Sequence, residues 1–116
     1  MTPIKRFYSI THPDTITCRG WRGHQIEQRW FKVLDGEFLI SLVKIDNWDF
    51  PTKETTFDNF KLSAELTEIL HVPCGYASLI RAIKENSKLL VFADYGIEHA
   101  TVDDYIYPEN YFIETK

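Results

Sequence analysis

Short strand-like segments separated by turn residues fill most of this chain, and they constrain its fold more than any other feature. The predicted strands span residues 4–10, 15–21, 27–34, 37–45, 60–62, 69–72, 77–83 and 88–95. Turn residues recur about every 8–12 positions, and no window keeps a helical period beyond about two turns. Segments of this length and spacing predict an all-β sandwich or barrel.

Asp35 and Gly36 separate two of these predicted strands. An Asp-Gly pair between two apolar segments is a strong signal for a tight hairpin turn. We therefore expect residues 27–34 and 37–45 to pair with each other as a β-hairpin.

Three further segments lack a strand pattern. Residues 47–58 are polar, contain Pro51 and are expected to form a long loop. Residues 63–66 fit either one helical turn or a polar turn. Residues 96–116 form an acidic, tyrosine-rich tail in which no strand is predicted.

Residues 38–43 are apolar on both faces of their predicted strand. In a small sandwich, a strand of this kind needs a cover on its outer face as well as on its core face. A subunit interface would supply that cover, so we expect a homodimer.

The bulk properties fit one domain, residues 1–116, with one core: 116 residues, 44% of them apolar. The formal net charge of −4 argues against a nucleic-acid binder but allows a local basic pocket. We expect Cys18 and Cys74 to be reduced thiols. No apolar segment follows the N-terminal residues and none reaches the ~18 residues of a membrane span, so we expect a soluble, cytoplasmic protein without membrane contact.

Residues 19–30 are the part of the sequence that most directly indicates function. They include three arginines, one histidine, one glutamate and two tryptophans: Arg19, Arg22, Arg29, His24, Glu27, Trp21 and Trp30. Because charge is costly to bury, a strand that mixes charged and aromatic side chains usually lines a cavity. A cationic, aromatic cavity suits an anionic ligand that also carries a sugar or base ring, which points to a nucleotide sugar.

Strand alternation groups these side chains into two pairs. Residues two apart share a face, so Arg22 and His24 lie together, and Glu27 lies with Arg29. Alternation alone does not establish that the two pairs converge on one site.

Two families share motifs with this chain. Residues 61–65 and 70–77, KLSAE followed by LHVPCGYA, resemble the LSAEN…IPxGFAH stretch of deoxysugar 3,5-epimerases (the dTDP-4-dehydrorhamnose epimerase family). Residues 29–46 resemble the same family's KLVRVLRGEVFDVAVD segment. The tail resembles a sister family, the dTDP-sugar 3,4-ketoisomerases (WxcM-like). Residues 93–95 (ADY), 104–106 (DYI) and 111–112 (YF) resemble the SDYY…DYIRxYDxF ending of that family. Residues 19–24 (RGWRGH) resemble its RGFHAH motif.

The resemblance covers residues 19–112 and implies a single-domain cupin-type jelly roll, also called a double-stranded β-helix. It also shows departures from both families. The catalytic base of the epimerases is a histidine, and Arg22 occupies its position in this chain. The tyrosine that acts as their acid falls near Leu90, and Ser78 occupies the position of the histidine that follows their Pro-x-Gly turn. The ketoisomerases use two histidines, and here only His24 is kept.

The resemblance implies a role for each candidate residue. His24 would move a proton between neighbouring sugar carbons through an enediolate, because an imidazole with a pKa near neutrality suits that transfer. Arg22 or Arg29 would stabilise the negative charge that develops on oxygen. Tyr95 would contact the diphosphate or donate a proton.

The remaining candidates are assigned to substrate binding, and each also has a structural reading. Arg19 would contact phosphate or sugar. Trp21 and Trp30 would stack on a base or sugar, or belong to the core. Glu27 would orient His24 or Arg29, or form a structural ion pair with Arg29.

The leading hypothesis is a cofactor-independent isomerase, a 3,4-ketoisomerase or an epimerase. It would act on a nucleotide-linked, most simply dTDP-linked, 4-keto-6-deoxy sugar in surface polysaccharide or lipopolysaccharide biosynthesis. The first alternative is a non-catalytic nucleotide-sugar-binding cupin or an accessory subunit of a sugar-modifying enzyme. The second is a metal-dependent cupin oxygenase, but His24 and Glu27 are too few ligands, so we expect no bound transition metal.

Overall fold

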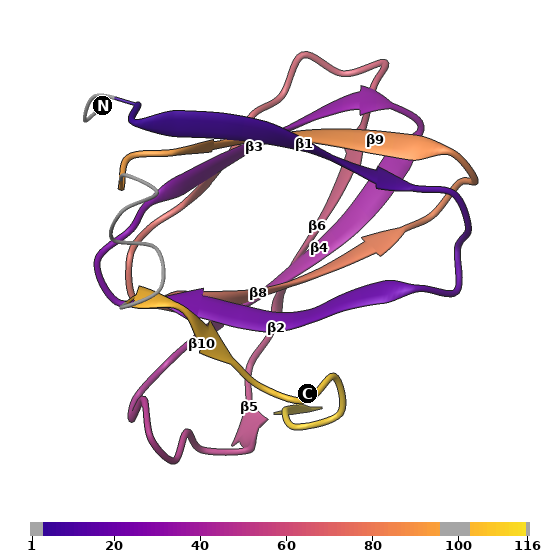
Figure 1. Cartoon of the computed structure of the whole chain (residues 1–116). Helices are drawn as coiled ribbons and strands as arrows, with labels where there is room; N and C mark the ends of the chain where they lie inside the picture. The colour runs from indigo at the N-terminus through magenta and orange to yellow at the C-terminus, as the bar shows by residue number, and fades with distance from the viewer. Residues whose placement is uncertain (1–3, 96–102, 116) are drawn as a thin grey trace.

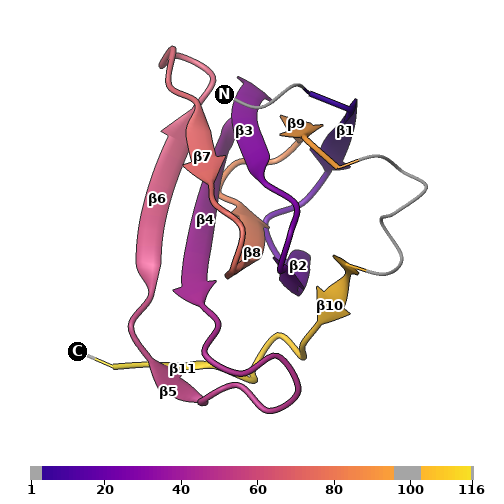
Figure 2. The same cartoon turned by 90° about the vertical axis from the view of Figure 1, so that its left-hand side faces the viewer.

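Two antiparallel sheets stacked face to face form the body of the computed structural model, which describes residues 4–95 and 103–115. Figures 1 and 2 show the two layers from the side and after a quarter turn. One sheet has the order β1 (Arg6–His12), β9 (Ser87–Ala93), β3 (Arg29–Asp35) and β7 (Leu70–Val72). The other has the order β10 (Tyr105–Ile106), β2 (Cys18–His24), β8 (Tyr76–Ala82), β4 (Glu37–Lys44) and β6 (Asp58–Ser63). The all-β prediction is confirmed.

A small third sheet closes one end of the molecule. It pairs β5 (Glu54–Thr55) with β11 (Ile113–Glu114) in parallel. Neither strand is predicted from the sequence, because two residues leave no periodic pattern. No helix capable of crossing a membrane is present among the described residues.

The hairpin predicted at Asp35 and Gly36 is wrong. β3 pairs with β7 and β9, whereas β4 pairs with β6 and β8, so the Asp-Gly turn carries the chain from one sheet to the other. The physical reason is burial. Phe31 of β3 and Phe38 of β4 are both fully buried in the core between the sheets, which places the two strands face to face rather than edge to edge.

Gly36 is required at this corner by two independent constraints. Its backbone has φ +73, a conformation that side-chain-bearing residues rarely adopt. A Cβ atom at this position would lie 2.1 Å from the Ser87 hydroxyl oxygen. That hydroxyl is buried, accepts a hydrogen bond from the Glu37 amide (3.1 Å) and donates one to the Lys84 carbonyl (2.7 Å), so it has no room to move.

A second apolar cluster covers the outer side of the five-stranded sheet. It contains Trp21, Val43, Ile45, Ala77, Tyr107 and Phe112. The aromatic side chains of the tail and of the 46–57 loop therefore pack on Val43 of β4 within the same chain. On the outer face of residues 38–43, Ser41 and Val43 are buried in the single chain and Leu39 is half-buried, so most of this face is covered without a partner subunit.

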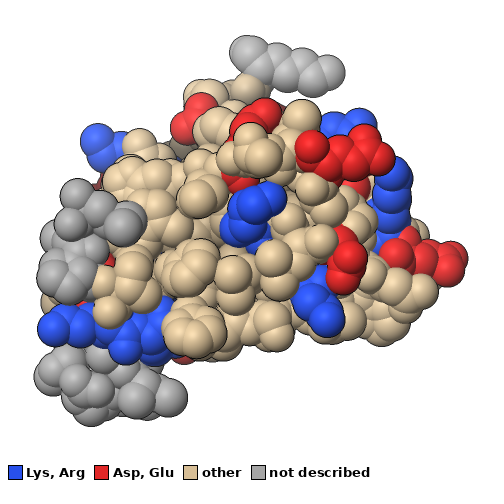
Figure 3. Space-filling model, turned by 90° about the horizontal axis from the view of Figure 1, so that it is seen from above, with Lys and Arg blue, Asp and Glu red and all other residues tan. Residues whose placement is uncertain are grey.

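The outer face of the four-stranded sheet has no such cover in the part of the chain that the structure describes. Figure 3 looks down on this side of the molecule and shows a largely uncharged surface with scattered charged side chains. Phe7 of β1 is 70% exposed and Leu34 of β3 is 43% exposed. The homodimer stays a prediction, and its interface would have to cover the outer face of the four-stranded sheet.

The Gly36→Ala substitution should lower the free energy of unfolding more than the Gly75→Ala substitution does. Gly75 also has positive φ, at +91, but a Cβ atom added there would meet nothing within 4 Å, so this position measures conformational strain alone, about 1–2 kcal/mol. The clash with Ser87 should add a further ~1–3 kcal/mol at Gly36. Urea denaturation measures both values, and equal losses would contradict the steric argument.

Candidate functional site

A β-bulge in β2 turns two arginines toward the interior. The pairing of β2 with β8 shifts register between Arg19 and Arg22. Residues three apart in a regular strand face opposite sides, but the extra residue lets both arginines face the space between the sheets. The strand predicted at residues 15–21 therefore does not end near Gly20, and β2 continues through the bulge to His24.

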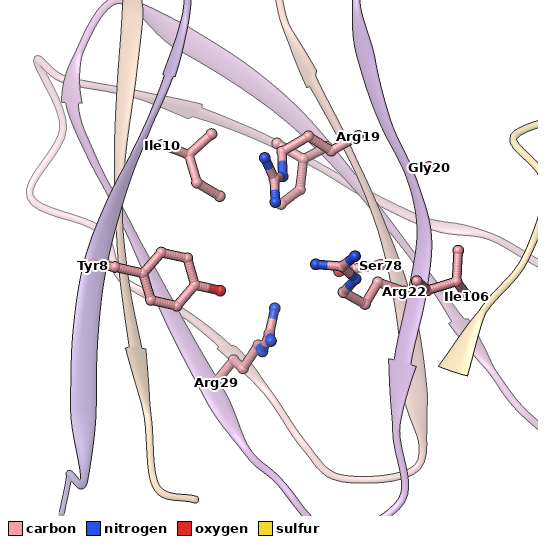
Figure 4. Close-up of a pocket in the computed structure, with 9 residues that line it drawn as sticks. Tyr8, Ile10, Arg19, Gly20, Arg22, Arg29, Ser78 and Ile106 are labelled. Atoms are coloured by element: carbon pink, nitrogen blue, oxygen red, sulfur yellow. The ribbon is translucent and has the colours of Figure 1, made fainter. Parts of the chain in front are cut away.

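A pocket of about 300 Å³ lies between the sheets at this bulge. Its lining residues are Tyr8, Ile10, Arg19, Gly20, Arg22, Arg29, Ser78, Ile80 and Ile106. Figure 4 shows the guanidinium groups of Arg19, Arg22 and Arg29 directed into one space opposite the Tyr8 ring and hydroxyl. The structure thus brings together three of the predicted site residues and adds Tyr8 and Ser78, which the sequence reasoning missed.

Sequence signals existed for both missed residues. Tyr8 and Ile10 alternate along β1, so both face inward toward the pocket. Ser78 lies directly across from Arg22 in the β2–β8 pairing. Without knowledge of which strands are neighbours, neither residue could be linked to the arginines.

A buried ion-pair network fixes Arg29. Its Nε atom is 2.5 Å from Glu27 Oε2, and Arg6 Nη2 is 2.6 Å from the other oxygen, Oε1. The Glu27 side chain is only 1% exposed, and a buried carboxylate is stable there only when cations and hydrogen bonds compensate it. Of the roles predicted for Glu27, orientation of Arg29 and a structural ion pair with it both fit this geometry.

Asp103 holds the turn that follows β2. Its carboxylate accepts hydrogen bonds from the backbone amides of Gln25 (2.9 Å), Ile26 (3.1 Å) and Glu27 (2.8 Å). The side chain is almost fully buried. Because 76 residues separate Asp103 from Glu27, no local pattern indicated this role.

The ring of His24 is buried and has a defined tautomer. Its Nδ1 atom is 2.7 Å from the Asp103 carbonyl oxygen. A carbonyl can only accept, so Nδ1 carries the proton and the neutral ring keeps a lone pair on Nε2. Nε2 lies 3.7 Å from Glu27 Oε2 and has no hydrogen-bond partner among the described residues.

Its surroundings favour the neutral form of His24. Burial, and then the positive charge of Arg29, lower the pKa of the imidazole below 6.5, and Glu27 only partly opposes this. A neutral ring with a lone pair on Nε2 is chemically able to accept a proton. His24 lies beside Arg29 and Glu27, next to the pocket, and is not among the residues that line it.

The two tryptophans and Tyr95 lie elsewhere. Trp21 is fully buried in the outer cluster of the five-stranded sheet, where its Nε1 donates to the Glu109 carbonyl (3.1 Å). Trp30 stacks on His71, at 5.2 Å between ring centroids. The Tyr95 carbonyl accepts a hydrogen bond from Arg6 Nε (3.2 Å). None of the three lines the pocket, so the positions of the tryptophans do not fit the predicted stacking on a ligand.

Metal binding has little support from these side chains. No group of three or more His, Cys, Asp or Glu side chains that could hold a metal ion occurs within residues 4–95 and 103–115. Both oxygens of Glu27 already bind guanidinium groups, and Ser78 stands where the resemblance would need a histidine. The donor set around His24 therefore does not fit a three-ligand site.

Solved structures with this fold include several proteins that act on sugars. No protein-family model matches the chain, and no curated protein matches it significantly. A variant of the 3,4-ketoisomerase QdtA from Thermoanaerobacterium thermosaccharolyticum, in complex with TDP-4-keto-6-deoxyglucose, has a TM-score of 0.68 at 22% identity; the match covers 87% of this chain and 64% of that one. For dTDP-4-dehydrorhamnose 3,5-epimerase from Bacillus anthracis the TM-score is 0.71 at 16% identity, covering 99% and 69%.

A third neighbour is much longer than this chain. The capsular polysaccharide assembling protein CapF from Staphylococcus aureus has a TM-score of 0.73 at 15% identity over 98% of this chain, which spans only 27% of CapF. At these low sequence identities, the structural similarity establishes the fold alone. They confirm the predicted cupin-type jelly roll.

Replacing Asp103 with alanine should lower the free energy of unfolding by about 2–4 kcal/mol, because three backbone amides lose a charged acceptor. Asp104→Ala is the matched control. Asp104 lies 3.2 Å from Arg22 Nε in a partly exposed ion pair, which should contribute less than about 1 kcal/mol. Denaturant titrations of both variants measure the difference, and similar losses would show that Asp103 does not hold the turn.

The His24 ring should remain neutral at pH values where an ordinary histidine is already protonated. Because its folded pKa is lowered below 6.5, the unfolded chain binds the proton first. Its contribution to stability is complete above that value and is lost as the pH falls from 6.5 toward the folded pKa. Burial lowers the pKa of His12 too, so it acts in the same direction.

An NMR titration of the ring resonances, assigned with a His24→Asn variant, measures this pKa. The same variant should reduce the loss of stability between neutral and mildly acidic pH. Protonation of His24 at or above pH 6.5 would contradict the described environment.

Proposed function

We propose that this protein is a cofactor-independent isomerase of nucleotide-linked 4-keto-6-deoxy sugars, acting by 3,4-ketoisomerisation or epimerisation in surface-polysaccharide or lipopolysaccharide biosynthesis. The single observation that carries the proposal is the fixed, neutral tautomer of His24 beside an arginine-lined pocket. The fold shared with a 3,4-ketoisomerase and a 3,5-epimerase of dTDP-linked sugars supports it. A dTDP-linked substrate, a homodimer and a cytoplasmic location are part of the proposal.

His24 is assigned the proton transfer. A ketone acidifies the C–H bonds next to it, so removal of one proton gives an enediolate without any cofactor. Nε2 of His24 would take this proton from C3 and return it to C4 on the same face, while the hydroxyl proton passes from O3 to O4, and this gives the 3-keto product. Epimerisation would instead need a second proton donor on the opposite face of the ring. The Nδ1–H bond to the Asp103 carbonyl keeps the ring in the tautomer that this step needs.

The arginines are assigned the negative charge. As the proton leaves, charge builds up on the ketone oxygen, and guanidinium groups already fixed in place stabilise it without reorganising. Arg29 is the better fixed of the candidates, because Glu27 holds its Nε atom in a buried pair. Arg22 is held less firmly, by its partly exposed contact with Asp104.

One observation favours a second function, a nucleotide-sugar-binding protein without turnover. His24 is nearly buried and lies outside the pocket lining, and Arg22 occupies the position of the first ketoisomerase histidine. A pocket with three arginines and no ring base in its wall would still bind an anionic sugar. This protein would then serve as a binding module or an accessory subunit.

Incubation with dTDP-4-keto-6-deoxyglucose in D2O, followed by proton NMR, tests the two functions. The isomerase should exchange the C3 hydrogen for deuterium. His24→Asn should slow this exchange by about 10²–10⁴-fold, the usual contribution of a general base. His71→Asn is the matched control, because His71 lies on the outer face against Trp30 and should leave the rate unchanged.

The possible outcomes distinguish the isomerase from the binding protein. If His24→Asn exchanges as fast as the wild type, His24 is not the base. If the wild type shows neither exchange nor product with dTDP-, UDP- and GDP-linked 4-keto sugars, the isomerase is excluded. Line broadening of the ligand without exchange would then support the binding protein.

A further inference from the structure

Among the described residues, the pocket carries more positive charge than neighbouring carboxylates balance. Three arginines line it and no acidic residue of residues 4–95 and 103–115 does, although the whole chain has a net charge of −4. Arg29 shares the Glu27 carboxylate with Arg6, and Arg22 contacts Asp104. Arg19 makes no ion pair with any residue in the described part of the chain. In the described part of the chain, the four guanidinium groups of Arg6, Arg19, Arg22 and Arg29 are therefore balanced by two carboxylates, those of Glu27 and Asp104.

This excess of positive charge limits what can bind. A ligand that fills the pocket removes water from the guanidinium groups of Arg19 and Arg22, and the loss of that water is costly for a charged group. A neutral sugar ring replaces it with hydroxyl groups only. An anionic group restores charge-assisted hydrogen bonds, which are about twice as strong as neutral ones.

The size of the pocket limits where that anion can lie on the ligand. A volume of about 300 Å³ is at the lower end of ordinary ligand pockets, and it suits a single sugar ring better than a whole nucleotide sugar. Apolar groups are interspersed with the arginines in its lining: Ile10 and the ring of Tyr8 come from β1, and Ile80 lies on β8 directly beside Arg19. Figure 4 shows the Tyr8 ring facing the space into which the three guanidinium groups point. A sugar ring with apolar C–H groups and an anionic edge fits this mixed lining.

We propose that the sugar bound in this pocket carries a carboxylate, as a nucleotide-linked uronic acid or other sugar acid does, and that Arg19 with Arg22 binds that carboxylate. The proposal rests on the proposed function only in placing the sugar, rather than the nucleotide, in the pocket. It replaces the neutral 6-deoxysugar of the proposed function with a sugar acid, because a uronic acid carries its carboxylate at C6 and is not a 6-deoxysugar; the proton transfer proposed for His24 is kept. Arg29, held by Glu27, remains available for the oxygen that becomes charged.

Isothermal titration calorimetry with matched ligands tests this. The ligands are UDP-glucuronic acid, UDP-glucose and UDP, together with the thymidine equivalents. The full chain should bind the glucuronate about tenfold or more tightly than the glucose derivative, as expected for a hydrogen-bonded charge pair. Arg19→Gln should remove most of that ratio. Arg81→Gln is the matched control, because Arg81 is an exposed arginine paired with Glu109 and lies outside the pocket lining.

Several results would overturn the proposal. Equal affinity for the glucuronate and glucose derivatives would do so, as would a preference that Arg19→Gln leaves intact, or failure of every ligand to bind. If UDP or dTDP alone binds as tightly as the glucuronate derivative and loses as much affinity in Arg19→Gln, the arginines hold the diphosphate instead. A thermal melt of each variant verifies that it is folded.

This experiment and the deuterium-exchange experiment fail independently. A preference for the carboxylate without exchange on the neutral 4-keto sugars would support the sugar-acid inference and reject 4-keto-6-deoxy sugars as substrates. Exchange on neutral 4-keto sugars with no preference for the carboxylate would leave the isomerase standing and reject the sugar-acid inference.

Discussion

The buried carboxylate of Asp103 is the interaction on which the site depends. It gathers three successive backbone amides at the end of β2, and the backbone carbonyl of the same residue fixes the His24 ring. A buried carboxylate needs hydrogen-bond donors, and here three backbone amides far from Asp103 in the sequence supply them. The same residue therefore shapes the turn and selects the imidazole tautomer.

Glu27 links this turn to the pocket. Its backbone is held by Asp103, and its side chain holds Arg29 and Arg6. A chain of hydrogen bonds and ion pairs thus runs from the tail through the turn to the pocket wall. Each member is nearly buried or partly buried, so water screens these contacts weakly and the geometry is rigid.

The sequence predicted most strands, because turn residues and apolar alternation are local signals. It did not predict that β3 and β4 lie in different sheets, since an Asp-Gly turn fits a sheet-to-sheet corner as well as a hairpin. Arg19, Arg22 and Arg29 could be predicted as neighbours of a cavity from their composition. Their long-range partners could not, because Asp103 acts on residues 25–27 across most of the chain. The positions of Trp21 and Trp30 outside the pocket lining also depend on which strands are neighbours, which no local pattern shows.

The bulge in β2 decides which side chains belong to which side of the five-stranded sheet. It lets Trp21 enter the outer cluster while Arg19 and Arg22, on either side of it, enter the pocket. An insertion or deletion of one residue here would exchange the two sets of side chains beyond it. Any alignment of this chain with a protein whose strand lacks the extra residue must therefore place a gap at the bulge. Without that gap, an aromatic core position would be equated with a ligand-binding one.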